Sequence, residues 1–258
     1  MVSSITLKNL IIGYRSKHQL RAIASPVHAS LQAGELTCLI GANGVGKSTL
    51  LRTLAGFQPA LDGEILIQDK SLSDFSAQEL AREISIVLTS KTDHAQLSAE
   101  EIVGIGRSPY TGFWGTLSAA DKQIVASALQ ETGIQHLAQR NISELSDGER
   151  QKVMIAKALA QQTRIIILDE PTAFLVCPSE VETLQGLGRL AYEQHKAILL
   201  STHDVELALQ LSDRLWLMEE SRFSIGTPKE LAADGSLSRF INRDGIRFNK
   251  DSLRIEIK

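Results

Sequence analysis

The stretch 41–49, Gly-Ala-Asn-Gly-Val-Gly-Lys-Ser-Thr, combines closely spaced glycines with a lysine and two hydroxyl side chains. Glycines let backbone N–H groups approach an anion, a lysine adds positive charge at the β- and γ-phosphates, and a serine hydroxyl ligates Mg²⁺. An apolar strand pattern precedes this stretch and a helical pattern follows it. We therefore predict a nucleotide-binding loop rather than an ordinary glycine turn. The N–H groups of Gly44, Gly46 and Lys47 would surround the β-phosphate, and Ser48 would bind Mg²⁺.

Two other predicted strands end in polar residues. Residues 164–170 form an apolar run typical of a buried parallel strand, which delivers Asp169 and Glu170 to its tip. Asp169 would hold Mg²⁺ directly or through water, and Glu170 would polarise a water aimed at the γ-phosphate. Residues 199–204 repeat the pattern, and His203 would donate a hydrogen bond to the γ-phosphate. Each of these residues, taken alone, has a structural alternative. The two acids could be solvated residues that end a strand, and the histidine could have a purely structural role.

Another phosphate-facing helix start is predicted far from the glycine loop. Residues 144–149, Glu-Leu-Ser-Asp-Gly-Glu, lead into a helical pattern with acidic residues in its first turn. A hydroxyl and a glycine at a helix N-terminus favour anion binding, because the first N–H groups of a helix have no partner within it.

Strand and helix patterns alternate along the chain, which predicts an α/β protein whose P-loop NTPase core contains a mostly parallel sheet. N-terminal antiparallel strands and an inserted α-helical subdomain complete the predicted fold. The strand patterns lie at 5–12, 19–31 with a break at Pro26, 34–41, 63–69, 84–88, 164–170, 196–202 and 213–218; helical patterns lie between 98 and 161, at 179–195 and at 204–212. We predict one domain over 1–258, with a core (1–88 and 164–235), a helical subdomain (89–163) and a small C-terminal extension (236–258) that forms a hairpin near its end.

The composition narrows the classes of function. The chain has 258 residues, 43% of them hydrophobic, and a formal net charge of -3, so a general nucleic-acid or anionic-lipid surface is not expected. Two cysteines without a CxxC pattern favour a reduced, cytosolic protein. No signal peptide and no run of 18 apolar residues is expected from the sequence, so we predict a soluble chain.

In their order and spacing, the glycine loop, "LSDGE", "LDEP" and "STHD" resemble the ATP-binding subunit of an ABC transporter over residues 1–235. The resemblance implies an ABC ATPase with ATP and Mg²⁺ as cofactors, Glu170 as the general base and His203 as the γ-phosphate contact. It also implies that Tyr14 stacks on adenine. The implied ATP-binding residues are Tyr14, Asn43, Gly44, Gly46, Lys47, Ser48 and Thr49.

The same resemblance explains the second helix start. Two subunits of such ATPases pair head to tail, so that the signature of one covers the ATP on the phosphate loop of the other. Ser146, Asp147, Gly148 and Glu149 would therefore face the partner's ATP in a homodimer. Asp147 and Glu149 stand where the family usually has glycine and glutamine.

A narrower resemblance lies in 100–121, which is similar to ATPases of importers for iron–siderophore complexes, haem and cobalamin. These ATPases carry a Gly-Arg-x-Pro segment near the surface that contacts the permease. The structural alternative is that the segment is only a Gly/Pro-rich loop between two helices. The resemblance implies a peripheral subunit on the cytoplasmic face of the inner membrane, with integral-membrane permease subunits, indirectly a substrate-binding protein, and no nucleic acid. A non-transport regulatory ATPase is the alternative, whereas a simple nucleotide kinase would not explain "LSDGE".

Two positions depart from the family pattern. Thr89 stands where a glutamine amide usually reaches Mg²⁺, so we expect Thr89 to act there through a water. Val176 stands where an aspartate usually crosses the dimer interface. Both departures affect coupling, so ATP binding is predicted more firmly than normal hydrolysis.

Overall fold

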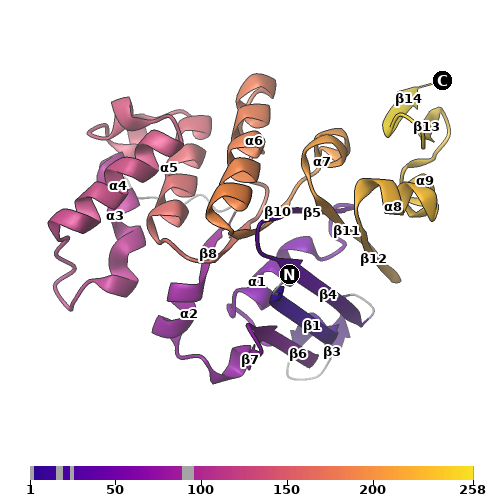
Figure 1. Ribbon diagram of the computed structural model, residues 1–258, viewed down its shortest axis with the longest axis horizontal. Helices are drawn as coiled ribbons and strands as arrows, with labels where there is room; N and C mark the ends of the chain where they lie inside the picture. Colours follow the sequence, from indigo (N-terminus) through magenta and orange to yellow (C-terminus); the bar gives the residue numbers. More distant parts are fainter. Residues whose placement is uncertain (1–2, 16–19, 24–25, 89–95, 258) are drawn as a thin grey trace.

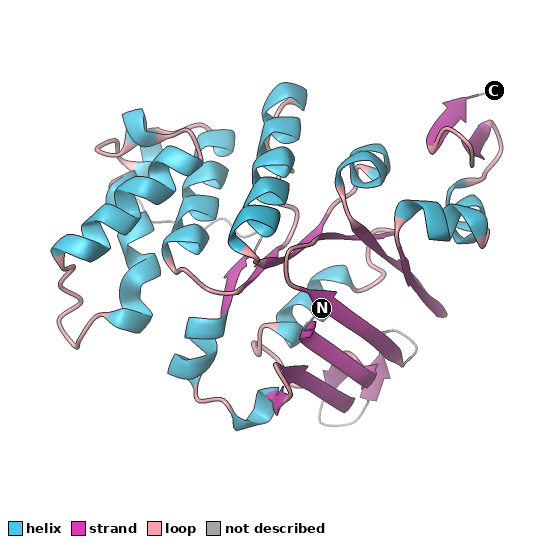
Figure 2. Ribbon diagram, viewed as in Figure 1, coloured by secondary structure: helices cyan, strands magenta, loops and turns pink. Residues whose placement is uncertain are grey.

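The computed structural model describes residues 3–15, 20–23, 26–88 and 96–257. A six-stranded sheet runs through its centre, with most of the helices on one side (Figure 1). A smaller antiparallel sheet and the helix α1 (Lys47–Leu54) lie on the other side. Figure 2 shows the helices of residues 99–160 at one end of the central sheet and the C-terminal helices and hairpin beyond the other. Among the described residues, no helix combines the length and apolar character required to cross a membrane.

The central sheet has the order β12-β11-β5-β10-β9-β8, in which β11, β5, β10, β9 and β8 pair in parallel and β12 is antiparallel. Parallel strands place their carboxyl ends along one edge, where ligands of open α/β sheets bind. The strands are β5 (Leu36–Gly41), β8 (Ile84–Val87), β9 (Ile165–Leu168), β10 (Ala197–Ser201), β11 (Arg214–Glu219) and β12 (Arg222–Gly226).

Both faces of this sheet are buried, which explains why its strands are continuous apolar runs in the sequence. Alternate residues of β9 belong to two different hydrophobic clusters. Ile166 and Leu168 pack with the helices, whereas Ile165 and Ile167 pack with the antiparallel sheet and the phosphate-loop helix.

The antiparallel sheet has the order β4-β1-β6-β7, and a separate pair, β2-β3, precedes β4 in the chain. The predicted N-terminal antiparallel strands and the break near Pro26 are confirmed. The bounds are β1 (Ser3–Ile11), β2 (Gly13–Arg15), β3 (Leu20–Ala22), β4 (Val27–Gln32), β6 (Asp62–Ile67) and β7 (Lys70–Ser71).

The helices predicted between 98 and 161 are present and pack mainly on each other, at the left of Figure 1. They are α3 (Ala99–Gly104), the 3-10 helix η2 (Ile105–Tyr110), α4 (Ala119–Glu131), the 3-10 helices η3 (Gln135–Leu137) and η4 (Ile142–Glu144), and α5 (Asp147–Ala160). The helical pattern expected around 134–140 is therefore only a short 3-10 turn. The division into core and helical subdomain stays a prediction.

The remaining helices are α1 (Lys47–Leu54), η1 (Leu72–Asp74), α2 (Ala77–Glu83), α6 (Cys177–Gln194), α7 (Val205–Leu211), α8 (Pro228–Ala233) and α9 (Ser236–Ile241). The chain ends in the predicted hairpin, formed by β13 (Ile246–Asn249) and β14 (Arg254–Ile257). The sequence patterns predict no element at α2, β12, α8 or α9.

Candidate functional site

The glycine loop connects β5 to α1, as its motif predicts. Gly46 is the N-cap of α1 and has a φ of 113°, and a Cβ at this position would lie 2.3 Å from Cγ2 of Ile23. Only glycine combines this left-handed backbone with so close a neighbour. No side chain caps α1, so the N–H groups of its first turn are available to an anion. At Gly44, with a φ of 78°, the space a Cβ would take is open, which fits a phosphate cradle.

Lys47, the first residue of α1, is 5% exposed. Its Nζ donates to the backbone oxygens of Gly41 at 2.8 Å and Ala42 at 3.3 Å, so the ammonium lies across the loop. Burial lowers the pKa of Lys47, and the negative charges of Glu170 and Asp169 oppose that shift. The lysine is therefore a desolvated cation whose nearby counter-charges are the acids at the end of β9.

Tyr14 projects from β2 at one end of the site and is 52% exposed. Its hydroxyl lies 3.0 Å from Oγ1 of Thr49, a buried residue of α1. This hydrogen bond ties the aromatic ring to the helix that follows the phosphate loop and leaves part of the ring accessible, as a stacking surface requires.

Asp169 and Glu170 follow β9 and have different surroundings. Asp169 is 4% exposed, and its Oδ1 accepts a 2.7 Å hydrogen bond from Oγ of Ser201 on β10. The Glu170 N–H donates to the same Ser201 oxygen at 2.9 Å, and Glu170 has a φ of 49°. Ser201 therefore contacts the carboxylate of Asp169 and the backbone of Glu170. The Asp169 side chain is buried, whereas the Glu170 side chain is 27% exposed.

His203 comes from the turn after β10 and meets Glu170. Its Nε2 donates to Oε1 of Glu170 at 2.5 Å, and the two side chains are 46% and 27% exposed. The two predicted catalytic side chains thus lie together at the surface of the site.

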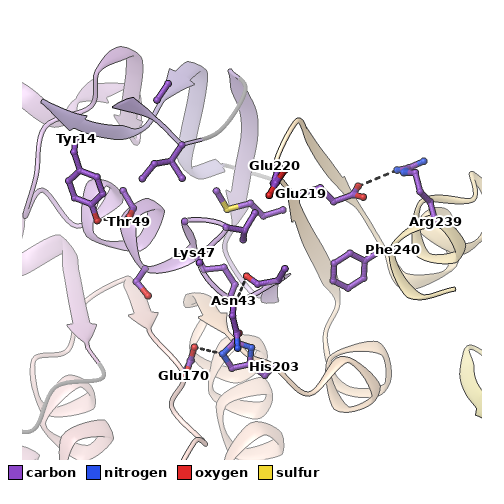
Figure 3. Close-up of a pocket in the computed structure, with 18 of the residues that line it drawn as sticks. Tyr14, Asn43, Lys47, Thr49, Glu170, His203, Glu219, Glu220, Arg239 and Phe240 are labelled. Carbon is purple, nitrogen blue, oxygen red and sulfur yellow. Dashed lines mark hydrogen bonds and ion pairs between the residues drawn. The ribbon is translucent and has the colours of Figure 1, made fainter. Parts of the chain in front are cut away.

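Tyr14, Lys47, Glu170 and His203 line one open cleft with a volume of about 980 Å³. In Figure 3, Lys47, Asn43, Glu170 and His203 lie around its middle, Tyr14 lies at one end, and Arg239 and Phe240 lie at the other. All seven predicted ATP-binding residues are among the lining residues. The lining residues that the sequence motifs do not indicate are Ala22, Ile23, Ala42, Val45, Met218, Glu219, Glu220, Arg239, Phe240 and Arg243.

The signature residues do not line this cleft. Ser146 is the N-cap of α5, and the first turn of that helix contains Asp147 and Glu149. Neither Ser146 nor its neighbours line the cleft, so within one copy of the chain the two helix starts that we predict to face phosphate do not share it.

The oxygen ligands expected for Mg²⁺ are Ser48, at the cleft, and Asp169, behind it. In the described part of the chain, no three His, Cys, Asp or Glu side chains gather into a metal site. A hydroxyl and one carboxylate fit Mg²⁺, which keeps several waters and takes further oxygens from phosphates. Thr89, the third expected contributor, lies outside the described residues.

The other departure, Val176, is 74% exposed and is the N-cap of α6, where it supplies no side-chain hydrogen bond. In the Gly-Arg-x-Pro segment, Gly106 and Arg107 are buried and Ser108 is exposed. The arginine is thus part of the interior. A few residues further along the chain, Phe113 and Trp114 are 96% and 87% exposed.

Comparison with known proteins agrees with this geometry. The ABC transporter family model matches residues 24–173, more than half of the chain. The iron(3+)-hydroxamate import ATP-binding protein FhuC of Bacillus subtilis is 36% identical over 211 residues, which cover 82% of this chain and 77% of that protein. The ferric enterobactin transport ATP-binding protein FepC of Escherichia coli is 31% identical over 239 residues, covering 92% and 87%.

Solved structures agree as well. A metal-chelate type ABC transporter in an inward-facing conformation matches with a TM-score of 0.76 and 26% identity, covering 93% of this chain and 89% of that one. A bacterial ABC transporter cassette solved as a dimer matches with a TM-score of 0.77 and 25% identity, covering 86% and 98%. The chain belongs to the ABC transporter family. It is an ATP-binding, ATP-hydrolysing subunit of the kind that powers a membrane importer.

Proposed function

We propose that this ATPase powers the import of an iron chelate, haem or cobalamin, as a homodimer on the cytoplasmic face of the inner membrane. Integral-membrane permease subunits would carry the cargo, and a substrate-binding protein would deliver it. The observation that carries the ATPase part is the cleft in which Lys47, Glu170 and His203 meet beside an uncapped helix start.

Within the cleft, Tyr14 would stack on adenine, and the 41–49 loop with Lys47 would bind the phosphates. Ser48 and Asp169 would hold Mg²⁺, which supplies neutralising charge on the β- and γ-phosphates. The hydrogen bond from Ser201 supports the role of Asp169, because it fixes one carboxylate oxygen and orients the other.

Glu170 would accept a proton from the water that attacks the γ-phosphate. Its contact with His203 supports this role, because a donor on one carboxylate oxygen orients the group and leaves the other oxygen for the water. A neutral imidazole has one N–H, so His203 would donate either to Glu170, as in this structure, or to the γ-phosphate once ATP is bound.

Ser146, Asp147, Gly148 and Glu149 would complete the site of a second copy. Two observations support this arrangement: the signature lies outside the cleft of its own chain, and the similar cassette solved as a dimer has the same fold. In this arrangement segments 1–88 and 164–235 bind the nucleotide, and 89–163 presents the signature.

The dimer proposal is tested with Glu170→Gln, which keeps the shape of the base but removes its ability to accept a proton. With ATP and Mg²⁺, this variant should bind nucleotide, hydrolyse it much more slowly and elute as a dimer, with or without the permease. The matched control combines Glu170→Gln with Ser146→Ala. Monomers in every sample would refute the composite site.

The cargo proposal rests on relatives that include importers for ferric hydroxamate, enterobactin, achromobactin and petrobactin. Its test is uptake by vesicles that contain the assembled transporter, with ferric hydroxamate, haem and cobalamin offered separately. ATP-dependent uptake of one of these, lost with Glu170→Gln, is expected. No uptake of any of the three would refute the assignment.

A further inference from the structure

The first turn of α5 is closed by a reciprocal pair of hydrogen bonds. The backbone N–H and the hydroxyl of Ser146 both donate to Oε2 of Glu149 at 2.8 Å, and the N–H of Glu149 donates to the Ser146 hydroxyl at 3.3 Å. A serine hydroxyl carries one proton to donate. While this capping box is closed, the hydroxyl proton of Ser146 is directed to Glu149 and cannot be donated to a phosphate.

The capping box itself is an ordinary helix start in this chain. The Ser98 hydroxyl donates to Glu101 at 2.9 Å at the start of α3, and α2, α4 and α8 begin in the same way. What distinguishes Glu149 is its partner, because Ser146 is the residue that would meet the triphosphate of a second subunit.

The two acidic side chains in the first turn of α5, Asp147 and Glu149, have different partners. Asp147 is paired with Arg150 at 2.8 Å, whereas the contacts that hold the Glu149 carboxylate are those to Ser146. Those hydrogen bonds lower the pKa of Glu149, with smaller help from the charges of Arg140 and His136. Glu149 is therefore ionised at neutral pH and would present a negative charge to an approaching phosphate.

We propose that Glu149 is a positioning residue that competes with the partner's triphosphate for the Ser146 hydroxyl and so sets the ATP concentration at which two subunits close. The inference rests on the proposed composite site. A glutamine, usual in the family, can close the same capping box without a charge, so the residue found here would raise the ATP requirement without altering the helix.

The experiment compares Glu149→Gln, which keeps the capping box and removes the charge, with Glu149→Ala, which removes both. The readouts are steady-state ATPase as a function of ATP concentration and the thermal midpoint of each purified full-length variant. We expect the half-saturating ATP concentration to fall about three- to tenfold in Glu149→Gln, the range for removing one like charge a few ångströms away in water. It should fall further in Glu149→Ala, which also frees the Ser146 hydroxyl.

The matched control is Glu101→Gln, the same change in a serine capping box away from the cleft, which should leave the ATP dependence unchanged. A helix-capping role alone predicts a parental ATP dependence in Glu149→Gln and a lower thermal midpoint in Glu149→Ala. That outcome, or a raised ATP requirement in Glu149→Gln, would overturn the inference. Failure of the proposed function gives a different result, in which Ser146→Ala hydrolyses ATP like the parent.

Discussion

Arg107 is a buried cation whose removal should destabilise the chain strongly. Its Nε donates to Asp121 on α4 at 2.9 Å, and its NH1 donates to the Ala160 oxygen at 2.8 Å and to Gln162 at 3.1 Å, at and just beyond the end of α5. The guanidinium also stacks over the Tyr110 ring at 4.2 Å. A single side chain thus fastens η2, α4 and the end of α5 together.

The substitution Arg107→Met keeps much of the apolar stem and removes every one of these hydrogen bonds. Breaking a buried ion pair from one side costs about 3–5 kcal/mol. We expect about 3 kcal/mol, the lower end, because the Asp121 side chain is 14% exposed and recovers some hydration. For a chain of this size, that loss lowers Tm by about 6–12 °C.

Urea denaturation, monitored by circular dichroism, measures the difference in free energy of unfolding between the parent and Arg107→Met. The free energy of unfolding of Arg107→Lys should lie between those of the parent and Arg107→Met. A lysine keeps the positive charge, but its ammonium lacks the planar guanidinium that reaches several acceptors. The matched control is Lys8→Ala, which breaks an exposed pair with Glu64 at 3.4 Å and should cost less than about 1 kcal/mol. If Arg107→Met costs no more than Lys8→Ala, the hydrogen bonds of Arg107 do not fasten the helices and the reasoning is wrong.

Three further predictions concern the cleft, the start of α6 and acid stability. Lys47→Ala should lower the ATPase rate roughly 10³-fold or more, because it removes the side-chain charge at the phosphates; phosphate release within a few-fold of the parent would contradict this. Val176→Asp in the assembled transporter should raise the rate or steepen its ATP dependence, whereas Val176→Asn should only cap α6 and stabilise it by about 1 kcal/mol; equal rates in both variants would make the charge irrelevant. Hydrogen bonds in the capping boxes lower the pKa of four carboxyl groups below the ordinary 4.5, those of Glu79, Glu101, Glu149 and Glu230. The stabilisation of the folded chain by these ionised groups is therefore complete above pH 4.5 and is lost as the pH falls through the lowered pKa values. Glu101→Gln should therefore have a shallower loss of stability with acid than the parent, and parallel curves would count against the assignment.

The residues around the phosphate loop could be predicted because their signal is local. The spacing of glycines in 41–49 and the acids after an apolar run specify a strand end and a helix start without reference to distant residues. Some local signals were overlooked. Ser76 and Glu79 frame the start of α2, and Thr227, Pro228 and Glu230 frame that of α8, with the spacing of a capping box.

Other parts of the cleft depend on strand order, which a single sequence does not specify. Met218 pairs with Gly41 because β11 lies beside β5, and this register brings the end of β11 to the phosphate loop. Arg239 and Phe240 reach the cleft only because α9 returns to the end of that strand, where Arg239 pairs with Glu219 at 3.5 Å. No spacing in the sequence indicates such a return.

The larger hydrophobic cluster has a consequence for exchanging parts between relatives. It contains Ile102 and Val153 from the helical region, Leu168 from the sheet, and Leu237 and Phe248 from the C-terminal extension, all nearly inaccessible to solvent. Side chains in such an interior are packed at crystal-like density, so a change of volume in one segment displaces its neighbours in the others. A chimaera could take its helical region from one ATPase and its sheet and C-terminal extension from another. Such a chimaera must keep the motifs, and it must also match side-chain volumes where the helical region packs on the sheet and on the C-terminal extension.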